Sequence, residues 1–138
     1  MSGYLLDTSV VARVHQEPVQ QATDHVRPDR LLYRCAIVEL EVQVTARSPA
    51  DYQATHDQLH GLTLDLPVTP NVLAAALEAQ RTLAMASQHR GVSLPDLIIA
   101  ACAQVHGATV LHYDRDYERI AEVTGQPVQW VVPRGTVD

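Results

Sequence analysis

The segment LPDLIIAACAQVHGATVLHYDRDYERIA, residues 94–121, holds the pattern that decides the fold. Its first half is almost entirely apolar, which predicts a helix over residues 95–106 that is buried on all sides. Gly107 ends that helix, and the apolar residues 109–112 predict a strand. The acidic stretch that follows begins a further helix over residues 114–124. Helices that alternate with short apolar strands are typical of an α/β domain.

The rest of the chain alternates in the same way. Further strands are expected over residues 4–6, 31–35, 64–66 and 128–132. Further helices are expected over residues 8–15, 18–26, 36–47, 49–60 (ended by Gly61) and 70–89 (capped by Thr69). The sequence therefore predicts one domain over residues 1–138. Its fold is a three-layer α/β/α arrangement with four or five short, mostly parallel strands in the central sheet.

The composition indicates a folded protein outside the membrane. Of the 138 residues, 46% are hydrophobic and 19% are charged, and the longest uncharged apolar stretch is too short to span a bilayer. The beginning, MSGYLLDTS, lacks the basic region of a signal peptide, so we expect a cytoplasmic location with no membrane partner. Cys35 and Cys102 lie among apolar residues and are expected in the core. No cluster of cysteine and histidine has the spacing typical of a zinc site.

The charged residues exclude several kinds of enzyme. All 10 basic residues are arginine, so neither a P-loop NTPase nor a Schiff-base enzyme is compatible with the chain. The net charge of −6 argues against a nucleic-acid partner, because nucleic-acid binders are usually basic. That argument fails if several acids hold divalent cations, since the arginines would then form a local phosphate-binding rim.

Four aspartates stand where a metal site would form. Asp7 follows the first expected strand, Asp114 and Asp116 follow the strand over residues 109–112, and Asp96 opens the buried helix. The carboxyl ends of parallel strands meet at one edge of a sheet, where ligands bind. Acids gathered there would repel one another unless Mg²⁺ or Mn²⁺ is bound. Two such ions are suited to phosphodiester hydrolysis.

Two glutamates lie on the expected helix over residues 36–47. The apolar side of this helix is predicted to consist of Ile37, Leu40 and Val44. At 100° per residue, Glu41 points with that side, whereas Glu39 falls on the polar side and is interpreted as a surface acid. A carboxylate on an apolar face is costly unless it is paired or binds a cation, so Glu41 is the stronger candidate.

Each acid also has a purely structural interpretation. Asp7, Asp96, Asp114 and Asp116 each stand at a helix start or turn, where a carboxylate caps the backbone or favours the helix dipole. Glu41 would pair with a buried arginine. The placement of all of them together favours the metal site.

Three stretches of the sequence resemble a known family. YLLDTSVVAR (residues 4–13), VELEVQVTAR (38–47) and the segment 94–121 resemble the PIN-domain family. They resemble most closely the VapC-type toxin ribonucleases of bacterial toxin–antitoxin pairs. The likeness covers essentially the whole chain in the family's order, and it implies the PIN-like α/β/α fold.

The resemblance also implies an activity and its residues. The implied catalytic acids are Asp7, Glu41, Asp96 and Asp114, with Glu39 as the alternative to Glu41. The implied ligands of Mg²⁺, for which Mn²⁺ would substitute, are Asp7, Asp96 and Asp114, with Asp116 beside them. Ser9 matches a hydroxyl that lines the family's site. The substrate would be RNA, cleaved by hydrolysis; the partners would be a cognate antitoxin and a second copy of the chain.

Arginines near these acids are candidates for contacts with phosphate. They are Arg13, Arg90, Arg115 and Arg119, with Arg115 and Arg119 on one helix face next to Asp114. An ordinary solvated face is the alternative. Where many relatives carry Ser or Thr, this chain has His112, which is interpreted as a packing or orienting residue.

Two other functions are compatible with the sequence. One is a PIN-like binding scaffold that has lost catalysis, which would neither need nor bind Mn²⁺ at these acids. The other is a haloacid dehalogenase-like phosphatase, which also begins with a strand and an Asp. That enzyme usually has a second acid where this chain has Ser9, and it needs a lysine that this chain lacks.

Overall fold

The computed structural model describes residues 3–138 and contains a five-stranded sheet in the order β3-β2-β1-β4-β5, with every neighbouring pair parallel. The strands are β1 (Tyr4–Leu6), β2 (Leu32–Arg34), β3 (Leu64–Asp65), β4 (Thr109–His112) and β5 (Val128–Trp130). The first strand is central, and Leu5 pairs in register with Val110 of β4. The predicted α/β class and parallel sheet are confirmed.

Seven α-helices and one 3-10 helix connect these strands within the described residues. They are α1 (Thr8–Val11), α2 (Glu17–Val26), α3 (Ala36–Gln43), α4 (Pro49–Leu62), α5 (Pro70–Met85), η1 (His89–Gly91), α6 (Leu94–His106) and α7 (Asp116–Thr124). Over residues 3–138, no helix has the length and apolar character that crossing a membrane requires.

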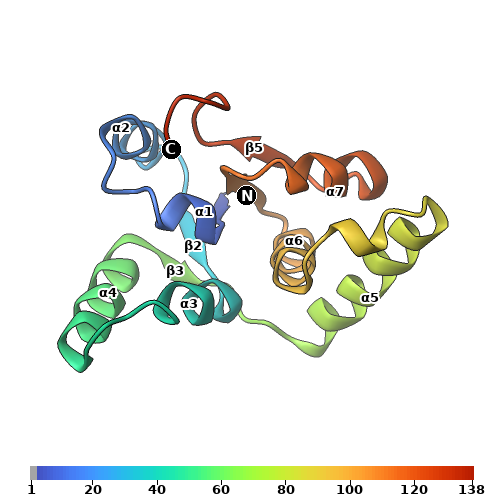
Figure 1. The fold of residues 1–138 in the computed structure, drawn as a ribbon, viewed down its shortest axis with the longest axis horizontal. Helices are drawn as coiled ribbons and strands as arrows, with labels where there is room; N and C mark the ends of the chain where they lie inside the picture. Colours follow the sequence, from blue (N-terminus) through green and yellow to red (C-terminus); the bar gives the residue numbers. More distant parts are fainter. Residues whose placement is uncertain (1–2) are drawn as a thin grey trace.

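Alternating strand residues supply two apolar cores, one on each face of the sheet. Leu5 and Val110 point into a core formed with α3, α5, α6 and α7. Leu6 and Leu111 point into a second core formed with α1, α2 and the segment after β5. Figure 1 shows α5 and α6 side by side, with α2 at the opposite side of the molecule beside the C-terminus. This is the three-layer arrangement predicted from the sequence.

Helix α6 is the central helix of the larger core. Its residues Ile99, Ala101, Cys102 and Ala103 are buried, as predicted for a helix that is apolar all round. Cys102 and Cys35 are both buried free thiols of this core, which agrees with their predicted role. Helix α6 therefore holds its first turn, and Asp96 with it, in a rigid position.

Several predicted helix ends are wrong, and for two of them the structure shows a local reason. Gly61 lies inside α4, whose end is instead set by Thr63, because the Thr63 hydroxyl donates to the Leu59 carbonyl at 2.6 Å. Helix α5 ends at Met85 rather than near residue 89, because Ser87 adopts a left-handed backbone with φ 57°. The helix expected over residues 8–15 is only one turn long, and the one over residues 36–47 stops at Gln43.

The predicted apolar side of α3 is also partly wrong. Leu40 and Val44 are 65% and 82% exposed, while Val38 is the fully buried residue of this helix. The inward face is therefore rotated toward Val38 and Val42. At 100° per residue, Glu41 falls between Ile37 and Val38, which both pack in the larger core, so its inward direction is retained.

Candidate metal centre

The predicted acids meet where the strand order reverses. The chain passes from central β1 outward through β2 to β3, then returns to add β4 on the other side of β1. In open parallel sheets, ligands bind beside the carboxyl ends of the two strands at such a switch point. Asp7 follows β1 directly, and Asp114 lies two residues after β4. The topology therefore brings together two acids that are far apart in the sequence.

Three aspartates form a compact group at this point. Asp96, Asp114 and Asp116 each offer a carboxylate oxygen, and these oxygens lie within 4.8 Å of one another. Asp96 stands in the first turn of α6, where the Ser93 hydroxyl caps the helix by accepting from the Asp96 amide at 3.3 Å. The Asp114 carboxylate accepts from the Asp116 amide at 2.9 Å, which fixes the start of α7.

Tyr117 joins Asp7 to this group. Its hydroxyl donates to Asp7 Oδ1 at 2.6 Å and lies 3.3 Å from Asp96 Oδ1. Burial, followed by the charges of Asp7 and Asp96, raises the pKa of the Tyr117 hydroxyl well above its ordinary value, so it remains a proton donor. Sequence reasoning missed this residue; the available signal was its place one helical turn after Asp114.

Ser9 ties the loops after β1 and β4 together. Its hydroxyl donates to Asp7 Oδ2 at 2.5 Å and accepts from the Tyr113 amide at 2.8 Å. The Ser9 amide also donates to Asp7 Oδ2 at 3.0 Å, so Asp7 caps α1 while its Oδ1 faces Tyr117. The Asp7 side chain therefore both caps α1 and belongs to the group of acids.

The two glutamates of α3 have different surroundings. Glu41 Oε1 accepts from the Thr8 hydroxyl at 2.7 Å, which places Glu41 beside the residue that follows Asp7. Glu39, interpreted as an ordinary surface acid, is instead half-buried and paired with Arg34 and His60. That interpretation was wrong because both partners of Glu39 come from other elements. The geometry therefore favours Glu41 over Glu39 at the aspartate group.

The aspartates are crowded enough to alter one pKa strongly. Asp96 is 8% exposed, and burial, followed by the charges of Asp7 and Asp114, raises the pKa of its carboxyl to about 7. An all-oxygen donor set of this kind is suited to Mg²⁺ or Mn²⁺ rather than to a soft ion. A divalent cation would neutralise the repulsion that raises the pKa. The residues present therefore fit a hard divalent cation.

His112 lies beneath the group without being exposed. It is 0% exposed, its Nδ1 accepts from the Asp114 amide at 3.2 Å, and burial is the main cause that lowers its pKa. A neutral imidazole in this place positions Asp114 through the backbone. The residue therefore has the packing and orienting place that the sequence indicated.

Arginines surround two hollows next to the aspartates. One, of about 380 Å³, is lined by Ser9, Arg13, Tyr113, Asp114, Arg115, Trp130 and Arg134. The other, of about 520 Å³, shares Arg115 and Arg134 with it and is also lined by Gln88, Glu118, Arg119 and Glu122. Two candidates already have protein partners: Arg13 donates to the Ser9 and Asp138 carbonyls, and Arg119 donates to the Gly91 carbonyl. Arg90 is exposed on η1 and lines neither hollow.

The sequence profile of the PIN domain family matches residues 4–123. This chain belongs to the PIN domain family. Among its relatives, Ribonuclease VapC51 of Mycobacterium tuberculosis (strain ATCC 25618 / H37Rv) is 44% identical over 135 residues, covering 98% of this chain and 97% of that protein. Ribonuclease VapC21 of Mycobacterium tuberculosis (strain CDC 1551 / Oshkosh) is 45% identical over 134 residues, covering 96% of each.

Solved structures of VapBC proteins share the fold. VapBC2 of Rickettsia felis, bound to a DNA fragment from its promoter, superposes with a TM-score of 0.80 at 15% identity, covering 94% of this chain and 98% of that chain. VapBC-5 of Mycobacterium tuberculosis, a member of the VapBC family of toxin–antitoxin systems, gives a TM-score of 0.65 at 25% identity, covering 94% and 96%. The resemblance drawn from the three sequence stretches is confirmed.

Proposed function

We propose that this PIN-domain chain is a toxin ribonuclease of the VapC type, which hydrolyses RNA phosphodiester bonds with a bound Mg²⁺ and is neutralised by a cognate antitoxin. The observation that carries the proposal is the meeting of acids at the switch point of the sheet: Asp7 and Asp96 share the Tyr117 hydroxyl, and a carboxylate oxygen of Asp114 lies within 4.8 Å of one of Asp96. The relatives named Ribonuclease VapC, matched over nearly their whole length, support the substrate class.

Several aspartates together would bind the ion. Asp7, Asp96 and Asp114 would be its ligands, with Asp116 next to Asp114 as a further oxygen donor. Glu41, held by Thr8, would orient water at the open side of the site. When bound, Mg²⁺ supplies Lewis-acid activation of water and neutralises charge that develops on the phosphate; Mn²⁺ would substitute for it.

The substrate would approach over the arginine-lined hollows. Arg115 and Arg134 line both hollows, and Arg115 directly follows Asp114, so these guanidinium groups would contact phosphates beside the scissile bond. Ser9 lines the hollow next to the metal ligands and would contact the substrate there. Tyr113 and Trp130 pack edge to face at 5.5 Å and present aromatic surface on which an unpaired base would stack.

The partners follow from the family. We infer a cognate antitoxin, which the VapBC assemblies among the structural relatives support. A homodimer is carried over from the resemblance, and a cytoplasmic location from the sequence, both as proposals. Gel filtration with light scattering of the purified chain would test the dimer.

The activity is tested by incubating purified protein with a structured RNA pool in Mn²⁺ or Mg²⁺. The proposal expects cleavage that EDTA abolishes and that is lost in Asp96→Asn. Cleavage should be retained in Asp29→Asn, a matched change at an exposed aspartate in the loop between α2 and β2. Calorimetry with Mn²⁺ on the same variants measures the ion directly.

Three outcomes would contradict the proposal. Intact RNA together with no Mn²⁺ binding would favour the binding scaffold. Cleavage that persists in EDTA, or equally in Asp96→Asn, would exclude the metal mechanism at these aspartates. Release of phosphate from small esters with RNA left intact would favour the phosphatase.

A further inference from the structure

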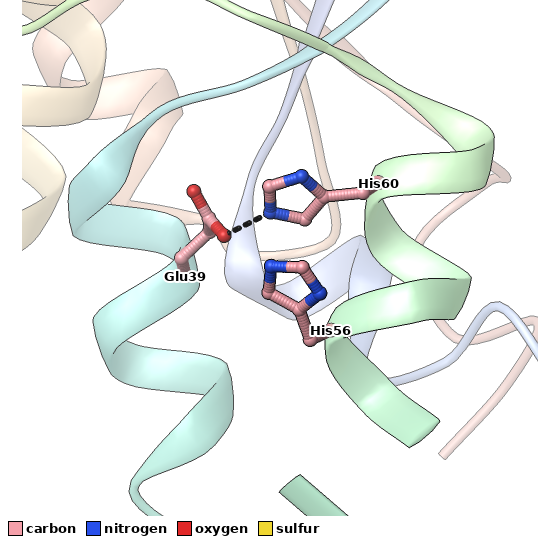
Figure 2. A group of neighbouring side chains, drawn as sticks. All are labelled: Glu39, His56 and His60. Atoms are coloured by element: carbon pink, nitrogen blue, oxygen red, sulfur yellow. Dashed lines mark hydrogen bonds and ion pairs between the residues drawn. The ribbon is translucent and has the colours of Figure 1, made fainter. Parts of the chain in front are cut away.

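A second group of metal-ligating side chains lies between α3 and α4. These two helices carry none of the clustered aspartates, and α3 carries Glu41. Glu39 comes from α3, and His56 and His60 come from α4 (Figure 2). One ligand atom of each of these three residues lies within 4.8 Å of the others. No zinc site was predicted from the sequence, because the carboxylate that completes the group stands on a different helix from the histidines.

The two histidines are arranged to present nitrogens in one direction. They are one helical turn apart, and their rings stack at 3.9 Å between centroids with an interplanar angle of 21°. His60 Nε2 lies 2.5 Å from Glu39 Oε1. His56 Nδ1 lies 3.4 Å from Asp57 Oδ1, so its other nitrogen, Nε2, is the one that Figure 2 shows on the side of Glu39 and His60.

An ion pair accounts for only part of this geometry. The contact of His60 with Glu39 would satisfy a protonated histidine, but the second, stacked imidazole adds nothing to such a pair. If both rings were protonated, two cations would stack at 3.9 Å and repel each other. Two neutral imidazoles with a carboxylate beside them are instead the donor set that borderline transition metals prefer.

We propose that Glu39, His56 and His60 bind one divalent transition-metal ion of the zinc class, separate from the Mg²⁺ site. Three protein ligands leave further positions for water, and the side chains of His56 and His60 are 42% and 33% exposed, so solvent has access to the site. The ion takes the place of the proton between His60 Nε2 and Glu39 Oε1.

The residues around the group support this assignment. Metal-bound histidines usually donate their other ring N–H to a carboxylate, and Asp57 stands at His56 Nδ1 in that role. Gln53 Nε2 donates to the same Asp57 oxygen at 2.8 Å and orients it. Arg34 holds the opposite oxygen of Glu39 at 3.3 Å, which leaves Oε1 directed toward the histidines.

The two sites differ in the ions they select. The aspartate group offers oxygen alone and suits Mg²⁺, whereas this group offers two nitrogens and one oxygen and suits Zn²⁺, Co²⁺ or Ni²⁺. A bound ion joins α4 to α3, the helix that carries Glu41. Occupancy therefore protects the amides of α4 from hydrogen exchange.

The test is a titration of the full chain, without a histidine tag, with Zn²⁺ and Co²⁺ in excess Mg²⁺. The Asp96→Asn variant serves as the background, so that the aspartate group does not take up the added ion. Calorimetry with Zn²⁺ is expected to give one equivalent bound, and Co²⁺ to give visible absorption. His56→Ala and His60→Ala should each weaken binding by about tenfold or more.

The control is His25→Ala, because His25 is an exposed histidine on α2 away from this group. It should leave the affinity unchanged, and circular dichroism should show all three variants folded. The proposal is overturned if Zn²⁺ does not bind in excess Mg²⁺. It is also overturned if binding survives both His56→Ala and His60→Ala, or falls equally in His25→Ala.

Discussion

At the scale of single residues, the buried carboxyl of Asp96 carries a large electrostatic cost. This carboxyl is buried beside Asp7 and Asp114, and burial, followed by those two charges, raises its pKa from the ordinary 3.8 to about 7. Between these two values the folded protein holds a proton that the unfolded chain releases. Stability without metal therefore falls as the pH rises from about 4 to about 7, and the whole penalty is present at about pH 8.

The Asp96→Asn variant should remove this penalty. At about pH 8 in EDTA, we expect its free energy of unfolding to exceed that of the unmodified protein by about 1–3 kcal/mol, because the amide cannot ionise. At about pH 4 the two proteins should be nearly equal. Urea unfolding across this pH range measures the difference, and a difference independent of pH would contradict the assigned pKa.

The Tyr117 hydroxyl partly compensates for the repulsion between the crowded carboxylates. This hydroxyl donates to Asp7 and lies close to Asp96, so Tyr117→Phe leaves buried charged oxygens without a donor. We expect a loss of about 1–3 kcal/mol of unfolding free energy in EDTA. Because a cation substitutes for the lost donor, Mn²⁺ should restore more stability to this variant than it adds to the unmodified protein.

Thermal melts with and without Mn²⁺ measure that gain. Tyr52→Phe, at a half-exposed tyrosine of α4, is the matched control and should respond to Mn²⁺ like the unmodified protein. An equal gain in Tyr117→Phe would show that the hydroxyl does not compensate the carboxylates.

The acids could be predicted from the sequence, while their partners could not. Asp7 and Asp114 stand within two residues of the ends of apolar strands, a pattern that is local, and the parallel sheet then brings them together. Tyr117 was missed because an aromatic residue on a helix usually indicates core packing, and only the fold shows its hydroxyl between two carboxylates. Glu39 was misinterpreted for the same reason, since Arg34 and His60 reach it from other elements.

At the scale of elements, the contact between α1 and α3 decides where Glu41 points. Thr8 Oγ1 donates to Glu41 Oε1 at 2.7 Å, and Thr8 is the first residue of the short helix that Asp7 caps. Thr8→Val keeps the shape but removes the donor. We expect a reduction in RNA cleavage of about 10–100-fold, because supporting hydrogen bonds around metal sites usually contribute this much.

Cleavage rates at saturating Mg²⁺ test the role of Thr8, and Thr8→Ser should recover most of the activity by restoring the hydroxyl. Thr82→Val, at a threonine of α5 that bonds only to its own helix, controls for the loss of a hydroxyl as such. Full activity in Thr8→Val would show that cleavage does not depend on the orientation of Glu41 by Thr8.

Helix starts were easier to predict than helix ends, for a physical reason. Ser48, Thr69 and Ser93 each accept from a backbone amide of the following first turn, and a proline follows each of them within two residues. These signals lie within a few residues of the boundary. The end of α5 depends on Ser87 in a left-handed conformation, which no propensity favours at serine.

At the scale of the whole molecule, the alternation of strands and helices predicted a parallel sheet but not its order. The position of β4 beside β1 depends on the packing of α5, α6 and α7 over one face, which involves residues distant in sequence. The central place of β1 then creates the switch point. A local reading of the chain could therefore indicate the acids at strand ends without showing which strands are neighbours.

The distribution of charge over the molecule decides how it would hold RNA despite a net charge of −6. Four aspartates are gathered at the metal site, and Arg115 and Arg134 line both adjoining hollows, the larger of which is also lined by two glutamates. Binding of a labelled single-stranded RNA to the inactive Asp96→Asn protein in Mg²⁺ should therefore weaken as salt rises from about 50 to about 200 mM. The slope of log affinity against log salt counts the phosphates contacted.

Arg134→Gln in that background should make this slope shallower by about 0.7, the value for one phosphate contact on a single strand. Arg30→Gln, at an exposed arginine remote from both hollows, should leave the slope unchanged even though it alters the net charge equally. Equal effects of the two substitutions would mean that net charge alone governs binding. A change confined to Arg134→Gln would locate the phosphate contact at the rim of the aspartate group, because that is where this guanidinium lies.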